Sequence, residues 1–129
     1  MIRRIGKFSL SVPLEYDCVD ENDEVVIFNE ENGRGSITIS SYVVPSEYHF
    51  DLKAELLDFI NSIDPDVRVE KNLVSGDRIW TDFIFKGKYW LISVIFRNNV
   101  AVFASYNSVD LEGNDELDII KKIIDSIVI

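Results

Sequence analysis

The stretch Arg78–Asn107, RIWTDFIFKGKYWLISVIFRNNVAVFASYN, decides the fold of this chain. It divides into three runs rich in Val, Ile, Phe, Trp and Tyr, the residues that favour β-strands. Gly87-Lys88 separates the first two runs and Asn98-Asn99 separates the last two, and both pairs are typical of tight hairpin turns. The stretch therefore predicts a three-stranded antiparallel meander.

These turns also predict a register, with Lys86 opposite Tyr89. One face of the meander is then a dense apolar layer, made of Ile79, Thr81, Phe83, Phe85, Trp90, Ile92, Val94, Phe96, Ala101 and Phe103. Such a layer predicts a core, so we expect Phe83→Ala to cost about 3–5 kcal/mol of stability. The opposite face is only partly polar, whereas an antiparallel sheet with one wet face alternates more strictly. We therefore expect the second face to be covered as well, at least in part.

Five residues of this second face form a candidate interaction patch: Trp80, Asp82, Leu91, Ile95 and Tyr106. If a helix covers them they belong to the core, and Asp82 then needs a buried partner such as Ser93 or Arg78. We favour this interpretation. If the face is open, the five side chains form an amphipathic surface of the kind that binds other proteins.

Further strands and a helix precede the meander. The apolar run Val25–Phe28 is a strand candidate, and period-two alternation predicts strands over Phe8–Val12, Ser36–Tyr42 and Val67–Val74. Between the last two, Leu52, Leu56, Phe59, Ile60 and Ile63 recur at helical spacing. Asp51 is placed to cap this helix, and Asp64-Pro65 ends it.

A second helix is predicted to begin near Asn114-Asp115. Its wide apolar stripe contains Leu117, Ile120, Ile123, Ile124, Ile127 and Val128. We prefer an arrangement with one helix over each face of the sheet. The fold class is therefore α+β, with six or seven antiparallel strands flanked by two helices in one domain over residues 1–129.

Charge and composition narrow the classes of partner. The chain has 23 acidic and 13 basic residues, for a net charge of −10. Such a surface repels the phosphates of nucleic acids and of anionic membranes.

The basic N-terminus is not followed by the apolar segment of a signal peptide, and no stretch approaches the roughly 18 apolar residues of a membrane span. With a single cysteine, Cys18, the chain is expected to be cytoplasmic.

The sequence also lacks the usual constellations of catalysis. His49 is the only histidine, and no Gly-x-Ser-x-Gly motif is present. One His and one Cys do not make a zinc site, and the acidic loop 20–24 lacks the spacing of a calcium loop. We therefore expect neither an enzyme nor a cofactor or metal.

A cluster of aromatic residues, Tyr42, Tyr48 and Phe50, lies at the start of the first predicted helix. These side chains have two interpretations. They close the end of the core, or they form an aromatic rim that faces a partner. Their burial decides between the two.

The order of the N-terminal elements resembles the opening of PsbP-like domains. The resemblance rests on Phe8-Ser9-Leu10-Ser11-Val12-Pro13, the aromatic Tyr16, a short strand ending in Phe28, and Ser36-Ile37-Thr38-Ile39-Ser40. That superfamily includes a photosystem II extrinsic subunit, a Ran-binding nuclear import factor and many small bacterial proteins. It implies an antiparallel sheet between helices and a role in binding or assembly, in a bacterial protein.

The leading functional hypothesis is a non-enzymatic protein-binding module, compatible with a toxin-immunity protein or an adaptor for an effector. Two alternatives stay open. One is a small-ligand-binding protein or enzyme with a pocket on the second sheet face, and the other is a structural homodimer paired through a strand edge or an open face.

Overall fold

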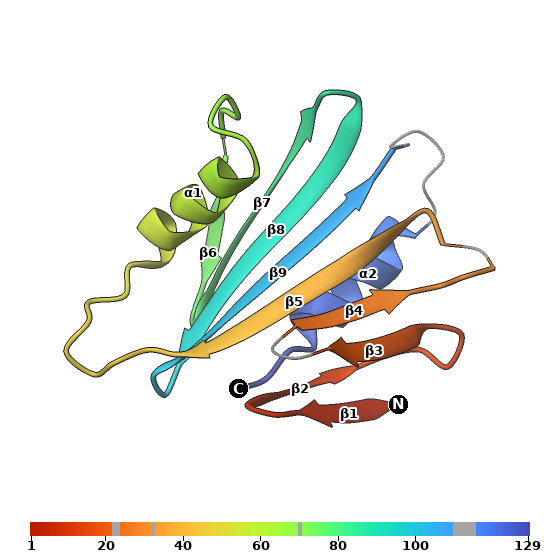
Figure 1. Ribbon diagram of the computed structural model, residues 1–129, viewed down its shortest axis with the longest axis horizontal. Helices are drawn as coiled ribbons and strands as arrows, with labels where there is room; N and C mark the ends of the chain where they lie inside the picture. Colours follow the sequence, from red (N-terminus) through yellow and green to blue (C-terminus); the bar gives the residue numbers. More distant parts are fainter. Residues whose placement is uncertain (22–23, 32, 70, 110–115) are drawn as a thin grey trace.

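The computed structural model describes residues 1–21, 24–31, 33–69, 71–109 and 116–129 (Figure 1). The strands are β1 (Ile2–Ile5), β2 (Phe8–Ser11), β3 (Asp17–Glu21), β4 (Glu24–Phe28), β5 (Gly35–Val43), β6 (Leu73–Ser75), β7 (Arg78–Phe85), β8 (Lys88–Arg97) and β9 (Val100–Ser108). The helices are α1 (Leu52–Ile63) and α2 (Leu117–Asp125). Within the described ranges, β3–β9 form a seven-stranded antiparallel sheet in the order β3-β4-β5-β9-β8-β7-β6, and β1 and β2 form a separate hairpin. The expected α+β class is confirmed.

The two helices lie on opposite faces of the sheet, as the sequence predicts (Figure 1). On one face, α1 packs against β7 and β8 through the buried side chains of Leu56 and Ile60. On the other face, α2 and the β1–β2 hairpin cover the strands together. We call these the α1 face and the α2 face.

Helix α1 has the bounds that the sequence predicts. The carboxylate of Asp51 accepts a hydrogen bond from the amide of Ala54 at 3.1 Å, which caps the first turn. At the other end, Asp64 has an extended backbone, and its amide still bonds the carbonyl of Ile60. Proline at position 65 prevents a further turn because the residue before proline is disfavoured in the helical region.

The meander is confirmed, but its predicted register is wrong by two residues. Lys86 and Gly87 both have positive φ and form the turn, so Phe85 pairs with Lys88. The sequence pattern predicts the turn one residue later, at Gly87-Lys88. Because a shift of two residues keeps every side chain on its face, the division into two faces survives the error.

Other predicted elements differ from the structure at their ends. The strand expected over Val67–Val74 is limited to β6, and strands β1 and β3 were not predicted. Helix α2 ends at Asp125, so Ile127 and Val128 lie beyond it. The start predicted for this helix, near Asn114-Asp115, lies outside the described residues.

The segment that follows α2 pairs with β2 of the N-terminal hairpin. Val128 forms an isolated antiparallel bridge with Ser9 of β2, with both N–H···O distances at 2.8 Å. Beside it, the hydroxyl of Ser126 accepts a hydrogen bond from the amide of Ser11 at 2.8 Å. The C-terminal segment therefore holds the N-terminal hairpin against the α2 face.

A buried carboxylate organises one end of the α2 face. Glu116, immediately before α2, is 5% exposed and accepts hydrogen bonds from the hydroxyls of Tyr16 at 2.6 Å and Tyr106 at 2.8 Å. The backbone amides of Arg34 and Gly35 also donate to it, at 3.1 and 3.3 Å. Burial, followed by the Glu116 hydrogen bond, raises the pKa of Tyr16 far above its ordinary value. This carboxylate therefore ties four separate segments together.

Candidate functional site

The predicted interaction patch is divided by helix α2. Leu91, Ile95 and Tyr106 are buried in the core of the α2 face. Trp80 is half-buried and Asp82 is exposed, because β7 lies at the margin of the area that α2 covers. The five residues therefore do not form one open surface, and only the part on β7 reaches solvent.

Asp82 has a different partner from either expected one. Its carboxylate accepts a hydrogen bond from the hydroxyl of Tyr89 at 2.9 Å. In the observed register Asp82 lies opposite Leu91, and Ser93 lies opposite Trp80. The hydroxyl of Ser93 instead donates to the carbonyl of Ile79 at 3.2 Å. Burial and the bond to Asp82 raise the pKa of Tyr89 well above its ordinary value.

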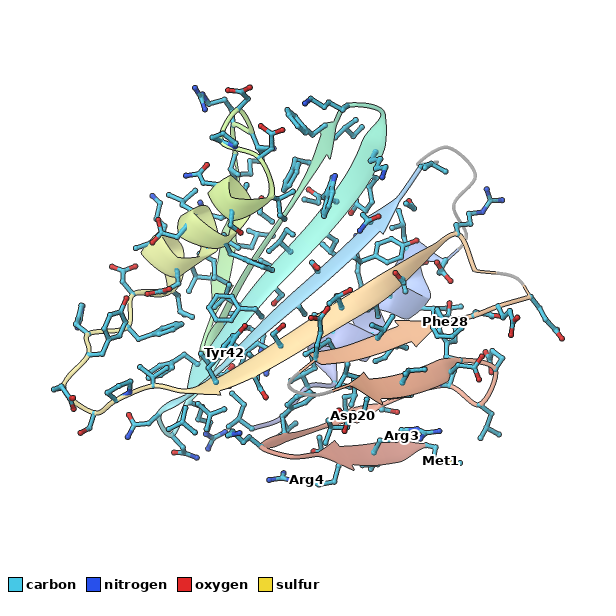
Figure 2. All side chains as sticks on the ribbon, in the orientation of Figure 1. Met1, Arg3, Arg4, Asp20, Phe28 and Tyr42 are labelled. Carbon is cyan, nitrogen blue, oxygen red and sulfur yellow. The ribbon has the colours of Figure 1, made fainter. Side chains whose placement is uncertain are left out.

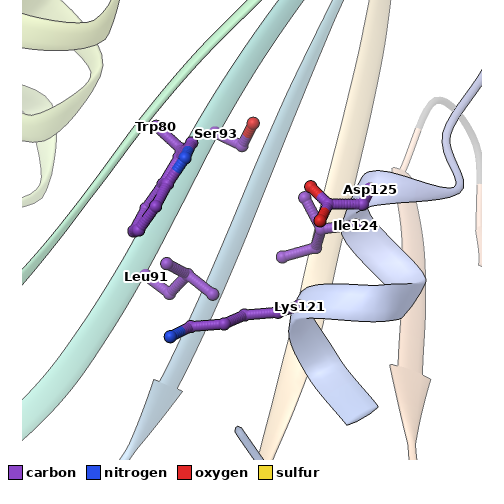
Figure 3. Close-up of a pocket in the computed structure, with 6 residues that line it drawn as sticks. All are labelled: Trp80, Leu91, Ser93, Lys121, Ile124 and Asp125. Carbon is purple, nitrogen blue, oxygen red and sulfur yellow. The ribbon is translucent and has the colours of Figure 1, made fainter. Parts of the chain in front are cut away.

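A small cleft lies where β7 and β8 meet α2 (Figure 3). Its volume is about 80 Å³, and it is lined by Trp80, Leu91, Ser93, Lys121, Ile124 and Asp125. The Lys121 ammonium lies 5.8 Å from the centre of the Trp80 ring, within the range of a cation–π contact. We call this the Trp80 cleft.

Arg78 fixes the position of α2 relative to β7, and so the width of the cleft. Its guanidinium donates to the carbonyls of Asp125 at 3.3 Å and Ile127 at 2.9 Å, at the C-terminal end of the helix. The carboxylate of Asp77 holds the same guanidinium at 3.0 Å. A cation that bonds the last carbonyls of a helix also complements its dipole. Arg78 therefore holds β7 and the end of α2 together beside the cleft.

Two exposed apolar side chains lie on the same edge of the sheet as Trp80. Leu73 of β6 pairs directly with Trp80 and is 56% exposed, and Ile84 of β7 is 64% exposed. Together, Leu73, Trp80, Asp82, Ile84 and Lys121 form what we call the Trp80 surface. Leu73, Ile84 and Lys121 were not singled out in the sequence, because nothing in their local pattern indicates where the cover of α2 ends.

A second set of exposed aromatic residues lies at the end of β5, where Tyr42 is labelled in Figure 2. Tyr42 and Tyr48 are each 53% exposed, whereas Phe50 is half-buried and stacked on Phe96. Phe50 therefore helps to close the end of the core, whereas Tyr42 and Tyr48 remain exposed at its edge.

The histidine and the cysteine, which are the side chains most often used in catalysis or metal binding, lie in different parts of the chain: His49 precedes α1 and Cys18 lies in β3. His49 is exposed, and Cys18 is half-buried in β3, where burial raises the pKa of its thiol. In the described part of the chain, no group of three or more His, Cys, Asp or Glu side chains is placed to hold a metal ion. Nor does any helix among the described residues have the length and apolar character of a membrane span.

Comparison with solved structures identifies the fold. The chain is similar to the cyanobacterial PsbP (CyanoP) solution structure from Synechocystis sp. PCC 6803, with a TM-score of 0.67, 9% identity, and coverage of 95% of this chain and 86% of that one. It is also similar to a crystal structure from Bacteroides thetaiotaomicron VPI-5482, with a TM-score of 0.60 and 13% identity. The match covers 94% of this chain but 44% of that protein. No family model and no curated protein matches the sequence. The chain has a PsbP-like fold, as the resemblance implied.

Proposed function

We propose that this protein is a non-enzymatic binding module that engages a partner protein through the Trp80 surface. The observation that carries the proposal is a half-buried tryptophan beside a preformed apolar cleft, with Leu73 and Ile84 more than half exposed next to it. Binding energy at protein interfaces is concentrated in such aromatic anchors and pockets.

The size of the cleft favours a side chain of a protein over a separate small ligand. Pockets for small molecules usually have volumes of about 300–1,000 Å³. At about 80 Å³ the Trp80 cleft is smaller even than the engineered cavity of about 150 Å³ that binds benzene. One aliphatic side chain of a partner is a suitable occupant. The size therefore favours the side chain of a partner over a small ligand in the Trp80 cleft.

The charge of the chain favours a partner with a basic surface. A net charge of −10 accelerates association with a positive protein and opposes contact with nucleic acids or anionic membranes. The same charge opposes the pairing of two copies, which is the homodimer alternative. Neutralisation of a toxin and escort of an effector are both roles that such a module can serve.

Site-specific photocrosslinking in the cells that produce the protein tests the proposal. A photoreactive residue is placed at Leu73, on the Trp80 surface, and in a control at Asn61, which is exposed on α1. We expect one protein to be captured from position 73 and not from position 61. We also expect the adduct to be lost in Trp80→Ala and in Ile84→Asp, where the second variant alters only an exposed side chain.

The proposal is wrong if positions 73 and 61 capture the same set of proteins. It is equally wrong if the adduct from position 73 survives both substitutions in protein that remains folded by circular dichroism. Capture of a second copy of the chain alone would replace the proposal with the homodimer.

A further inference from the structure

A groove of about 230 Å³ lies between the end of β5 and the start of α1. Two phenylalanine rings, Phe50 and Phe103, form its inner side, with their centroids 6.4 Å apart. Phe50 is itself stacked on Phe96 at 4.3 Å, and Phe103 meets Phe59 of α1 at 5.3 Å. The inner side of the groove is therefore fixed by the aromatic packing of the α1 face.

Two exposed tyrosines form the walls. The ring of Tyr42 stands edge-on to Phe103, with centroids 5.9 Å apart, and the ring of Tyr48 stands edge-on to Phe50 at 6.5 Å. The Tyr48 hydroxyl donates a hydrogen bond to the Glu55 carboxylate at 2.5 Å, and this bond raises the pKa of Tyr48. The Tyr48 amide bonds the carbonyl of Pro45 at 3.0 Å in the loop. Both walls therefore have fixed positions although about half of each ring faces solvent.

The surroundings of the groove are acidic. Glu55 lines it, and Glu47, Asp51 and Asp58 lie exposed on the adjoining loop and helix. In the segment from residue 44 to residue 59, Lys53 is the only lysine or arginine, against four carboxylates. A partner with a positive charge beside its apolar contact is therefore favoured electrostatically.

We propose that this Tyr42–Tyr48 groove binds a proline-rich segment of a partner protein, in the polyproline II conformation, with an Arg or Lys beside the prolines. The inference concerns a site separate from the Trp80 surface and does not depend on it. Grooves lined by aromatic rings are sites at which several families of binding domain take up proline-rich segments. A polyproline II segment has three residues per turn and no internal hydrogen bonds, so it offers flat pyrrolidine rings to the groove at a low cost in entropy.

Two features of the groove separate this occupant from an added strand or a docked helix. The amide of Val44 already bonds the carbonyl of Asn99 at 2.7 Å, so that donor is not available to an added strand. An amphipathic helix generally needs a longer apolar groove, since its anchors are spread over two turns or more. The basic residue of the partner is expected to reach the Glu55 carboxylate, which can accept it while keeping the hydrogen bond from the Tyr48 hydroxyl.

Peptide titration of the full-length, isotopically labelled protein by NMR tests the inference. The probes are peptides containing Pro-x-x-Pro, with Arg placed before or after the prolines, and matched peptides with alanine in place of both prolines. We expect shift changes at residues 42–50 and 101–103 with one of the Arg-containing peptides. Replacing its prolines, or replacing Tyr42 or Tyr48 by Ala, should weaken binding at least tenfold.

Variants identify the charge contact and separate this site from the Trp80 surface. Glu55→Gln should weaken binding of the Arg peptide severalfold, but not binding of the same peptide with Arg replaced by Gln. Trp80→Ala should leave the titration unchanged. The inference is overturned if no peptide shifts these residues at millimolar concentration, or if the alanine peptides bind equally well. Tighter binding by a helical basic peptide of the same charge would also overturn it.

Discussion

The two faces of the sheet are closed in different ways. On the α2 face, a helix and the N-terminal hairpin together cover the strands, and the largest side chains are almost fully buried. On the α1 face, one helix packs on β7 and β8, and β5, on the far side of β9, presents half-buried Ser36, Thr38 and Ser40. Strand β8 is apolar on both sides, whereas β5 alternates apolar and polar residues. In these two strands, the pattern of apolar and polar residues matches the cover that each face receives.

The largest effects should come from two isoleucines of the same strand. Ile95 points to the α2 face and Ile92 to the α1 face, and both are fully buried. We expect Ile95→Ala to cost about 4 kcal/mol and Ile92→Ala about 3 kcal/mol, because a cavity costs less where neighbours can move to fill it. Urea unfolding of both variants measures the difference. A larger loss for Ile92→Ala would mean that the α1 face is the more rigid one.

An intermediate effect is expected from the buried carboxylate of the α2 face. Glu116→Gln keeps the shape but removes the charge that two tyrosine hydroxyls and two amides contact. Hydrogen bonds to charged groups contribute about 1.5–3 kcal/mol, so we expect a loss of about 2 kcal/mol in urea unfolding. The exposed Glu15 is a matched control, and Glu15→Gln should change stability by less than about 0.5 kcal/mol. Equal effects of the two substitutions would contradict the organising role of Glu116.

A smaller effect is expected from Phe83, contrary to the value that its sequence pattern suggested. Its ring lies on the expected face and is stacked near Trp90, at 6.2 Å, but it is only half-buried. We therefore expect Phe83→Ala to cost about 1 kcal/mol, since truncation at a half-exposed site leaves little cavity. A loss of about 3 kcal/mol or more in thermal or urea unfolding would contradict this expectation, because it would mean that the Phe83 ring is fully enclosed on the α1 face.

The smallest effect on stability is expected at the rim of the α1 face. Tyr42→Ser removes a ring that is 53% exposed, so the free energy of unfolding should change by less than about 0.5 kcal/mol. The same variant should lose binding of proline-rich peptides. A stability loss above about 1 kcal/mol would place Tyr42 in the core and not in a binding groove.

Much of the fold was predictable because local signals agreed with one another. The period of Leu56 and Ile60, the cap at Asp51 and the stop at Pro65 define α1 without any tertiary information. The turn at Asn98-Asn99 was equally clear, and both residues have positive φ. The turn at Lys86-Gly87 was misplaced because both placements give the same alternation and differ only in which residues pair.

The missed parts are those in which the position of a residue depends on distant contacts. Strand β3 contains Asp17, Asp20 and Glu21, and a charged edge strand does not look like a strand in sequence. The exposure of Leu73 and Ile84 depends on where α2 ends its cover, which no local pattern reports. The Trp80 surface was therefore only partly predictable: Trp80 and Asp82 were identified from β7, and their neighbours were not.

The bridge between Ser9 and Val128 has a consequence for how the protein is made. While the chain is still being synthesised, the α1 face can assemble as soon as β9 has left the ribosome. The other face must wait for residues 117–129, because α2 and the bridge to β2 come from them. Until then Phe8 and Leu10 lack the part of their core cluster that α2 supplies, and nascent chains with exposed apolar groups are prone to aggregate. We therefore expect residues 117–129 to limit the yield of soluble protein more strongly than their number suggests.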